Sequence, residues 1–238
     1  MNAYGELSSM NNNKLLIYGF GGFGLEVLSY IKAELSVGKR DATNQRLTVA
    51  GIIDENGDRQ RDVNQWLGDS ATLFKDVDDL DSNEYSFVVA IGDPQTRHKC
   101  FQKCLSVGLR PLTVVHPTAV VDSSASIGDG SILGPFSLVA PNAQMGANSV
   151  LNIYSSLGHD AILGHSSVLS PYATLNGAAT CGGQSFLGTH ATILPEKRLG
   201  DYSKLSAGSV LCNDTESGSL AVGNPAKHRV IFPKPNQD

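Results

Sequence analysis

The chain has 238 residues, of which 41% are hydrophobic and 17% charged, so it can bury one large core or two small ones. Its formal net charge is −5 and no basic stripe runs along it, which argues against nucleic acid as a partner. No apolar run approaches the roughly 20 residues of a membrane-spanning helix, so we expect no membrane insertion.

The N-terminal segment 1–13 is polar and lacks the apolar core of a signal peptide, so we predict a disordered tail there. The four cysteines have no metal-ligand spacing, and two of them, Cys100 and Cys104, lie four residues apart on a predicted helix. These features are typical of a reduced, cytoplasmic protein.

Residues 14–115 alternate between short apolar runs and segments of helical spacing. We predict strands at 14–18, 47–53, 87–91 and 112–115, helices at 25–37 and 95–107, and irregular structure or a short helix within 58–82. This alternation predicts a small parallel α/β sheet with ligands at the carboxyl ends of its strands.

A glycine-rich loop follows the first predicted strand, and its residues Gly19, Gly21 and Gly24 match the dinucleotide-binding spacing. Such glycines let the backbone approach a phosphate at a helix N-terminus. The acidic pair Asp54 and Glu55 ends the next strand, where it could bind hydroxyls of a ribose or a base edge. About 100 residues are too few for a complete two-half dinucleotide fold, so a nucleotide or nucleotide sugar fits better than a dehydrogenase's nicotinamide cofactor. A packing turn without a ligand remains the alternative.

Residues 115–216 form an uninterrupted series of six-residue repeats. Every sixth residue from Val115 to Leu211 is apolar at all seventeen positions, and the residue four places later is Ala, Ser or Thr at every position except Lys197. Neither the helical period of 3.6 nor the strand period of 2 requires a unit of six. A coil with three short sides does, and such repeats gain their core by stacking. We therefore predict a parallel β-helix domain at 116–230, followed by a tail at 231–238.

His159 is the third residue of its repeat, and the residue one full coil later, Gly177, should stack over it. A glycine above an imidazole leaves room and a backbone N–H, as a general base beside an oxyanion donor requires. Asp160 could fix the imidazole tautomer. An isolated surface histidine is the alternative. A zinc site needs three converging imidazoles, but His159 and His165 lie on neighbouring sides of the coil and no two histidines within the repeat are separated by whole coils.

Several segments resemble one known family, the hexapeptide-repeat acetyltransferases that act on nucleotide-diphospho-4-amino sugars, together with the related sialic-acid O-acetyltransferases. The resemblance covers 14–230 and depends on the segments at 18–24 (YGFGGFG), 53–56 (IDEN), 89–92 (VAIG), 157–164 (LGHDAILG) and 222–227 (VGNPAK). It implies an α/β N-terminal domain with a small parallel, Rossmann-like sheet, followed by an all-β left-handed parallel β-helix. It also implies a homotrimer of surface-glycan (lipopolysaccharide O-antigen) biosynthesis, with acetyl-coenzyme A bound in clefts between neighbouring β-helices.

The resemblance assigns roles to individual residues. His159 takes the position of the family's base, Asp160 that of its acidic partner and Gly177 that of its oxyanion donor. The coenzyme-binding positions map to His165, Val168, Thr189, Ala207 and Lys227, and those for the nucleotide sugar to Gly21, Gly22, Phe23, Asp54, Glu55 and Gly92. No metal is implied.

The chain departs from the family at two of these positions. The glycine loop usually carries His where this chain has Phe23, and the position nine residues after the base is often His but is Val168 here. His165, three residues earlier, is the candidate replacement. The expected reaction is acetyl transfer to the amine, at C4, of a nucleotide-linked sugar. The alternatives are O-acetylation of sialic acid or another sugar hydroxyl, a binding or scaffold protein without catalysis, and, least favoured, a dehydrogenase.

Overall fold

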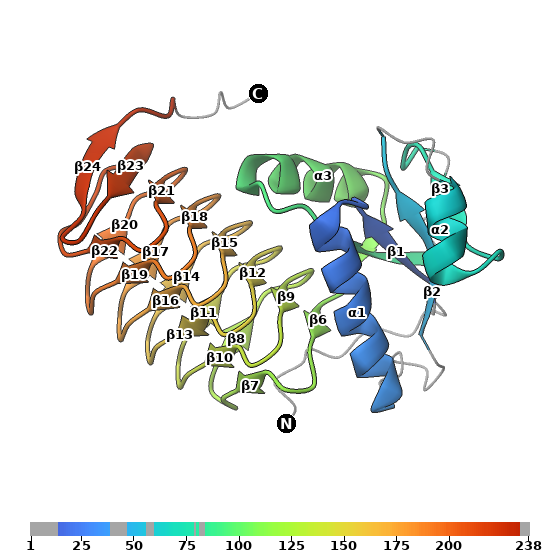
Figure 1. Cartoon of the computed structure of the whole chain (residues 1–238), viewed down its shortest axis with the longest axis horizontal. Coiled ribbons are helices and arrows are strands. Elements are labelled where there is room, and N and C mark those ends of the chain that lie inside the picture. Colours follow the sequence, from blue (N-terminus) through green and yellow to red (C-terminus); the bar gives the residue numbers. More distant parts are fainter. Residues whose placement is uncertain (1–13, 39–46, 56–59, 79, 81–83, 234–238) are drawn as a thin grey trace.

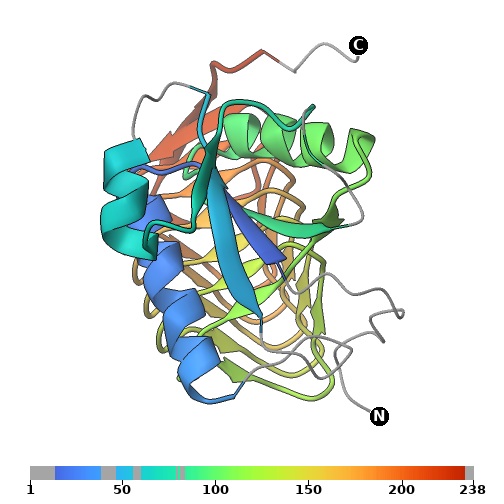
Figure 2. The same cartoon turned by 90° about the vertical axis from the view of Figure 1, so that its right-hand side faces the viewer.

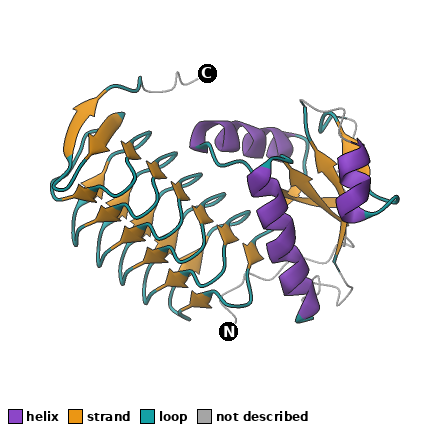
Figure 3. Cartoon of the chain, viewed as in Figure 1, coloured by secondary structure: helices purple, strands orange, loops and turns teal. Residues whose placement is uncertain are grey.

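The computed structural model describes residues 14–38, 47–55, 60–78, 80 and 84–233. They form an α/β unit followed by a long three-sided coil of short strands (Figures 1 and 3). The predicted tail at 1–13 and the last residues of the predicted tail at 231–238 lie outside the described part of the chain. Within the described part, no helix is long and apolar enough to cross a membrane.

The α/β unit contains a five-stranded parallel sheet with the strand order β3-β2-β1-β4-β5. Its strands are β1 (Lys14–Tyr18), β2 (Thr48–Ile53), β3 (Thr72–Phe74), β4 (Tyr85–Val89) and β5 (Arg110–Pro111). Its helices are α1 (Gly22–Ser36), α2 (Gln60–Leu67) and α3 (Pro94–Ser106). The central strands β1 and β4 are almost fully buried, as continuous apolar runs in a parallel sheet should be.

Three details differ from the prediction. Helix α1 begins at Gly22 rather than near residue 25, because the glycine loop itself turns into the first helical turn. The segment 58–82 contains both a helix, α2, and an edge strand, β3. The sheet ends with β5, while Val114–Val115, predicted to be its last strand, pairs with Ile132–Leu133 and so opens the β-helix.

The β-helix is a prism with three faces, each a sheet whose neighbouring strands, from β6 to β22, are 18 residues apart. Face 1 comprises β6 (Val114–Val115), β9 (Ile132–Leu133), β12 (Val150–Leu151), β15 (Val168–Leu169), β18 (Phe186–Leu187), β21 (Lys204–Leu205), β23 (Ser219–Val222) and the antiparallel β24 (Lys227–Val230). Face 2 comprises β7 (Val120–Val121), β10 (Leu138–Val139), β13 (Ser156–Leu157), β16 (Thr174–Leu175), β19 (Thr192–Ile193) and β22 (Val210–Leu211). Face 3 comprises β8 (Ser126–Ile127), β11 (Gln144–Met145), β14 (Ile162–Leu163), β17 (Thr180–Cys181) and β20 (Arg198–Leu199).

The predicted columns fill the prism. The second residue of each short strand points inward, and from Leu133 to Leu211 these side chains are at most 3% exposed. The small residues stand at the edges where the chain turns. Along the edge between faces 3 and 1 they are serines whose hydroxyls donate to carbonyls of the next coil, for example Ser149 to Gly164 at 2.9 Å and Ser167 to Gly182 at 2.8 Å. The fold class predicted from the repeat is therefore confirmed.

The α/β unit covers face 1 of the prism, and Figure 2 shows the coils behind it. The outward side chains of Val114, Ile132, Val150 and Val168 share one apolar cluster with α1. The buried Glu34 of α1 accepts a hydrogen bond from the backbone N–H of Val115 at 2.8 Å. The two parts are thus joined by a continuous core, and none of the described residues outside the prism covers its other two faces.

Arg97 of α3 forms a second connection between the two parts. Its side chain is fully buried, and its guanidinium donates to the carbonyls of Val89 and Ile91 in the α/β unit. It also donates to those of Asn148, at 2.6 Å, and Gly130 in the prism. Burial lowers the pKa of Arg97 to about 9, so the group is still protonated at neutral pH. One cation therefore holds the strand that leads to Gly92 against the prism.

Candidate active site

His159 lies on the edge between faces 2 and 3, called edge 2/3, directly after β13. Its Nδ1 is 2.8 Å from Oδ2 of Asp160, and 69% of its side chain is exposed. A carboxylate at Nδ1 selects the tautomer in which Nδ1–H donates, which leaves the lone pair on Nε2. The imidazole is thus arranged to accept a proton at Nε2 from a reactant outside this edge.

Asp160 is held in turn by Asn142, whose amide Nδ2 donates to Oδ1 at 3.1 Å. These hydrogen bonds, first from His159 and then from Asn142, hold the pKa of the Asp160 carboxyl below its usual range. Asn142 lies one coil below Asp160 on the same edge. The sequence prediction missed it, although the same 18-residue step that links His159 to Gly177 leads from Asp160 back to Asn142.

Gly177 stands over His159, as the repeat predicted. A Cβ on Gly177 would lie 2.4 Å from Nε2 of His159, so any side chain at this position would collide with the imidazole. Its backbone N–H has no hydrogen-bond acceptor in the described part of the chain, whereas the N–H of Gly183, six residues later, donates to Asp201 at 2.8 Å. A free N–H beside a basic nitrogen is the arrangement that stabilises an oxyanion formed next to a base.

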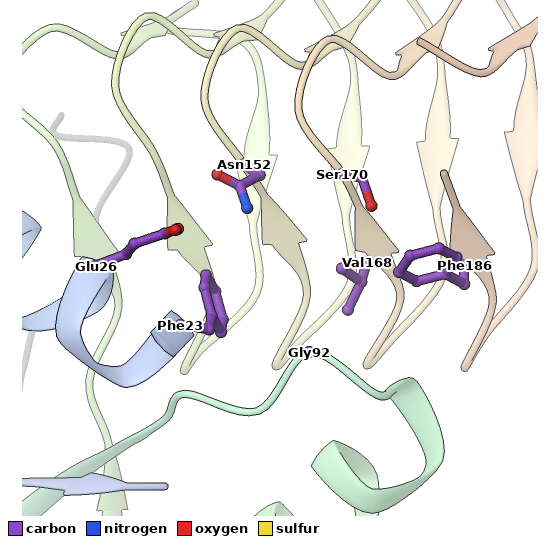
Figure 4. Close-up of a pocket in the computed structure, with 7 residues that line it drawn as sticks. All are labelled: Phe23, Glu26, Gly92, Asn152, Val168, Ser170 and Phe186. Atoms are coloured by element: carbon purple, nitrogen blue, oxygen red, sulfur yellow. The ribbon is translucent and has the colours of Figure 1, made fainter. Parts of the chain in front are cut away.

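A pocket lies between the α/β unit and face 1 (Figure 4). Phe23 at the start of α1 and Gly92 after β4 form one side of it, and Val168 and Phe186 on face 1 form the other. Three polar side chains complete the lining, namely Glu26, Asn152 and Ser170. The positions at which the chain departs from the family, Phe23 and Val168, thus line the same pocket.

The sequence prediction did not include Glu26, Asn152, Ser170 or Phe186. Phe186 follows Val168 by one coil, and Ser170 follows Asn152 by one coil, so the repeat contained a signal for these pairs. Nothing in the repeat, however, specified that α1 would lie against face 1. The pocket depends on that packing.

The glycine loop leads into α1, whose first turn contributes Phe23 to this pocket. Gly21 is the N-cap and provides no side-chain cap for the N–H groups of the first turn, which include those of Gly22 and Phe23. Gly24 packs against the carbonyl of Gly19, where a Cβ would come within 2.4 Å of the oxygen. Uncapped N–H groups at a helix N-terminus favour an anion such as a phosphate.

The acidic pair after β2 has partners within the chain. Glu55 accepts a hydrogen bond from the hydroxyl of Tyr18 at 2.5 Å and one from Nζ of Lys103 at 2.9 Å. These two contacts hold the pKa of the Glu55 carboxyl below its usual range. The backbone N–H of Asp54 donates to the carbonyl of Phe74 at 3.0 Å. Glu55 therefore belongs to a cluster of charged side chains within the chain. This cluster also contains Asp76, which is 2.9 Å from Lys103.

The coenzyme candidates lie at different places. His165 is on the edge between faces 3 and 1, where its ring is 5.2 Å from that of His98 in α3. Thr189 and Ala207 are exposed on the edge between faces 1 and 2, called edge 1/2, and Lys227 begins the exposed strand β24. In the described part of the chain, no group of three or more His, Cys, Asp and Glu residues could hold a metal ion.

The catalytic candidates and the candidates that line the pocket therefore form two groups that one chain does not bring together. Val168, Phe23 and Gly92 meet at face 1, whereas His159, Asp160 and Gly177 meet at edge 2/3. In a three-sided prism, the edge between two faces lies opposite the third face, so the base and the pocket are on opposite sides of the same β-helix.

Comparison with known proteins agrees with this architecture. Residues 14–104 match the family described as the PglD N-terminal domain. The acetyltransferase domain of PglB from Neisseria gonorrhoeae is 26% identical, with a TM-score of 0.79 over 91% of this chain and 99% of that one. It has also been solved in complex with acetyl coenzyme A.

A mutant of perosamine N-acetyltransferase from Caulobacter crescentus, solved with CoA and GDP-perosamine, is 28% identical, with a TM-score of 0.78 over 93% of this chain and 99% of that one. A search of curated protein sequences finds no significant match. Residues 14–104 thus match the model of the PglD N-terminal domain, and the chain is, as its motifs indicated, similar over nearly its whole length to acetyltransferases of nucleotide-linked amino sugars.

Proposed function

We propose that the protein transfers acetyl from acetyl-coenzyme A to the amino group, at C4, of a nucleotide-linked amino sugar. The observation that carries this proposal is the set formed by Asp160, His159 and Gly177, in which a carboxylate orients an imidazole under a free N–H. The similarity to enzymes solved with acetyl coenzyme A, and with CoA and GDP-perosamine, supports the choice of donor and acceptor.

The chemistry follows from this set. The amine attacks the thioester carbonyl, so a C–N bond forms and the carbonyl oxygen becomes an oxyanion that accepts a hydrogen bond from the N–H of Gly177. Nε2 of His159 takes the proton that the attacking nitrogen loses, while Asp160 stabilises the resulting imidazolium. The C–S bond then breaks, and the coenzyme thiolate leaves and receives a proton from His159.

We place the nucleotide at the glycine loop, with its phosphates at the N–H groups of Gly22 and Phe23 and its sugar in the pocket lined by Val168 and Phe186. Because His159 lies on the opposite side of the prism, the reacting amine must meet the partner subunit's His159. A homotrimer with three shared sites satisfies this requirement and leaves no site incomplete. Thr189 and Ala207, on the exposed edge 1/2, are placed to contact the coenzyme in the same cleft.

The direct test is a panel of UDP-, GDP- and dTDP-linked 4-amino sugars, assayed with acetyl-coenzyme A for thiol release. We expect saturable release with at least one of them and an N-acetylated product by mass spectrometry. Thiol release with free sialic acid alone would instead identify the protein as an O-acetyltransferase. Failure of acetyl-coenzyme A to bind would identify a non-catalytic protein.

Mixing two inactive variants tests the shared site. The His159→Ala chain keeps the pocket, and the Phe23→Glu chain keeps the base but presents a carboxylate to the nucleotide phosphates. If each site combines the two sides of different subunits, co-assembled variants regain a fraction of the activity that neither variant has alone. Activity no greater than the sum of the two separate variants, with mixed assembly verified by native mass spectrometry, would rule out a shared site.

A further inference from the structure

Glu26 is the only charged residue among the seven described residues that line the pocket beside face 1 (Figure 4). The other six side chains are apolar or neutral, and the proposed function gives Glu26 no role. A carboxylate beside a small pocket attracts cations and repels anions, and this effect is stronger where the ligand displaces water. Glu26 should therefore influence which charge the pocket accepts.

A buried tyrosine orients this carboxylate. The hydroxyl of Tyr30, one turn further along α1, lies 3.4 Å from Oε2 of Glu26 and 3.5 Å from Oδ1 of Asn152 on the prism. Burial, together with the charge of Glu26, raises the pKa of Tyr30 to about 12, so its hydroxyl remains a donor at neutral pH. Oε1 of Glu26 accepts no hydrogen bond from the described residues. One oxygen of the carboxylate is thus oriented by the chain, and the other is available to a ligand.

Polarity changes in a fixed order along the first two turns of α1. The N-terminus has uncapped N–H groups, Phe23 adds an aromatic ring, and Glu26 follows three residues later on the same face of the helix. A ligand that lies along this face meets an anion-binding end first, an apolar side chain second and a carboxylate last. The ligand that matches this order has a negative group at one end and a positive group at the other.

We propose that Glu26 selects the sugar by charge, binding the ammonium form of an amino sugar and disfavouring sugars that carry a carboxylate. The inference rests on the proposed function, which places the phosphates at the glycine loop and the sugar in this pocket. Primary amines, like the side chain of lysine, are mostly protonated at neutral pH, so the sugar arrives as a cation. An ammonium group has three N–H donors, of which Glu26 uses one, and the others remain for the base.

Glu26 is a positioning residue in this proposal, and the proton of the attacking nitrogen still goes to His159. Phe23 and Phe186 contact the ring carbons whatever charge the sugar carries, so the carboxylate is the feature that distinguishes amino sugars from acidic ones. The same selection separates the two candidate acceptors, because sialic acid is an anion at neutral pH. The pocket therefore favours the N-acetylation substrate over the O-acetylation substrate.

The test compares glucose and glucuronate linked to the same nucleotide, in UDP, GDP and dTDP forms, by calorimetric binding. These ligands differ only in a hydroxymethyl or a carboxylate at C6. We expect the wild-type protein to bind the glucose form of at least one nucleotide at least about tenfold more tightly than the glucuronate form. Glu26→Gln should reduce this ratio to about twofold or less, whereas Glu26→Asp, which keeps the charge, should retain most of it.

Glu84→Gln is the matched control. It removes the same charge at an exposed position before β4, at the opposite end of the sheet from the pocket, where Glu84 pairs with Lys14. This variant should keep the wild-type ratio. Thermal unfolding verifies that all three variants are folded.

Steady-state kinetics with the active amino sugar provide a second readout. Glu26→Gln should raise KM for the sugar about tenfold and leave kcat nearly unchanged, because the base and the oxyanion donor are untouched. Equal affinity of the wild type for the two hexose forms, or a ratio that Glu26→Gln leaves unchanged, would overturn the proposal. Acetyl transfer without charge selection would refute the role of Glu26 alone, whereas charge selection without transfer to any amino sugar would refute the proposed function alone.

Discussion

Edge 2/3 and face 1 of the same prism differ in how far their candidate residues are exposed and in which contacts hold them in place. On edge 2/3, His159 is 69% exposed and is oriented by one carboxylate, which is itself held by one amide. On face 1, the pocket lies on a shared apolar core next to the fully buried Arg97. The candidate chemistry therefore depends on a few local hydrogen bonds, whereas the candidate binding site depends on the packing of two structural units. Variants at the two places should therefore fail in different ways.

The largest effect on activity should come from His159→Ala. General-base catalysis contributes typically about 10²–10⁴-fold, so kcat should fall by that factor. The melting temperature and the affinity for acetyl-coenzyme A should stay close to those of the wild type, because the side chain is exposed. Steady-state kinetics, calorimetric binding and thermal unfolding measure these quantities. Full activity in this variant would remove His159 from the mechanism.

Gly177→Ala keeps the backbone N–H but should reduce kcat by roughly 10²-fold, because it moves the general base away from this N–H. The new Cβ would lie 2.4 Å from Nε2 of His159 and must displace the imidazole. Gly208→Ala, at a glycine with no neighbouring atom within 4 Å of its Cβ position, provides a control for the general effect of replacing a glycine on this coil, although its φ of 67° adds some strain. Equal loss of activity in both variants would contradict a specific role for Gly177.

Unlike the variants at His159 and Gly177, which should mainly lower kcat, Arg97→Met should mainly lower the stability of the fold. It leaves the carbonyls of Val89 and Asn148 buried without their donor, and hydrogen bonds to a charged group contribute about 1.5–3 kcal/mol each. We expect the free energy of unfolding in urea to fall by at least about 3 kcal/mol. In the folded fraction, KM for the nucleotide sugar should rise while kcat stays nearly constant. A change confined to kcat would contradict the role of Arg97 as a positioning residue.

Asn142→Ala should have a smaller effect on the base. Asp160 keeps its contact with His159 but loses the amide that fixes its other oxygen, so we expect kcat to fall about tenfold or less. Asn142→Asp places a second carboxylate beside Asp160 and should be more harmful than Asn142→Ala. If the alanine variant were the more impaired of the two, Asn142 would have a different role.

The smallest effect should come from the Glu55–Lys103 pair and should appear only in stability. The folded pKa of Glu55 is lowered, so its contribution is present above its ordinary pKa and is lost as the pH falls through the folded value. Lys103→Met should therefore lower Tm by a degree or two at about pH 6–7, and the difference from wild type should shrink below about pH 4. Thermal unfolding between pH 3 and 7 tests the sign. A difference that grew on acidification would refute it.

The sequence alone determined the prism, and with it the stacking of Gly177 over His159. Residues 18 apart stack because each coil repeats its neighbour, so the contact depends only on local repetition. The same 18-residue step leads from Asp160 to Asn142 and from Val168 to Phe186, although neither Asn142 nor Phe186 was predicted. The boundary between β5 and β6 was misplaced for the opposite reason, since a strand of two residues belongs to whichever sheet lies beside it.

Which face of the prism is covered, and which residues line the pocket between the α/β unit and that face, depend on the tertiary packing. Phe23 and Val168 are 145 positions apart in the chain and share a pocket because α1 packs on face 1 and Arg97 holds α3 against the adjoining edge. Glu55 stays a predicted ligand contact, and its carboxylate also accepts hydrogen bonds from Tyr18 and Lys103, which neither composition nor spacing could reveal. Repeats determine contacts along one axis by translation, whereas contacts between different elements depend on the packing of whole surfaces, which no short motif encodes.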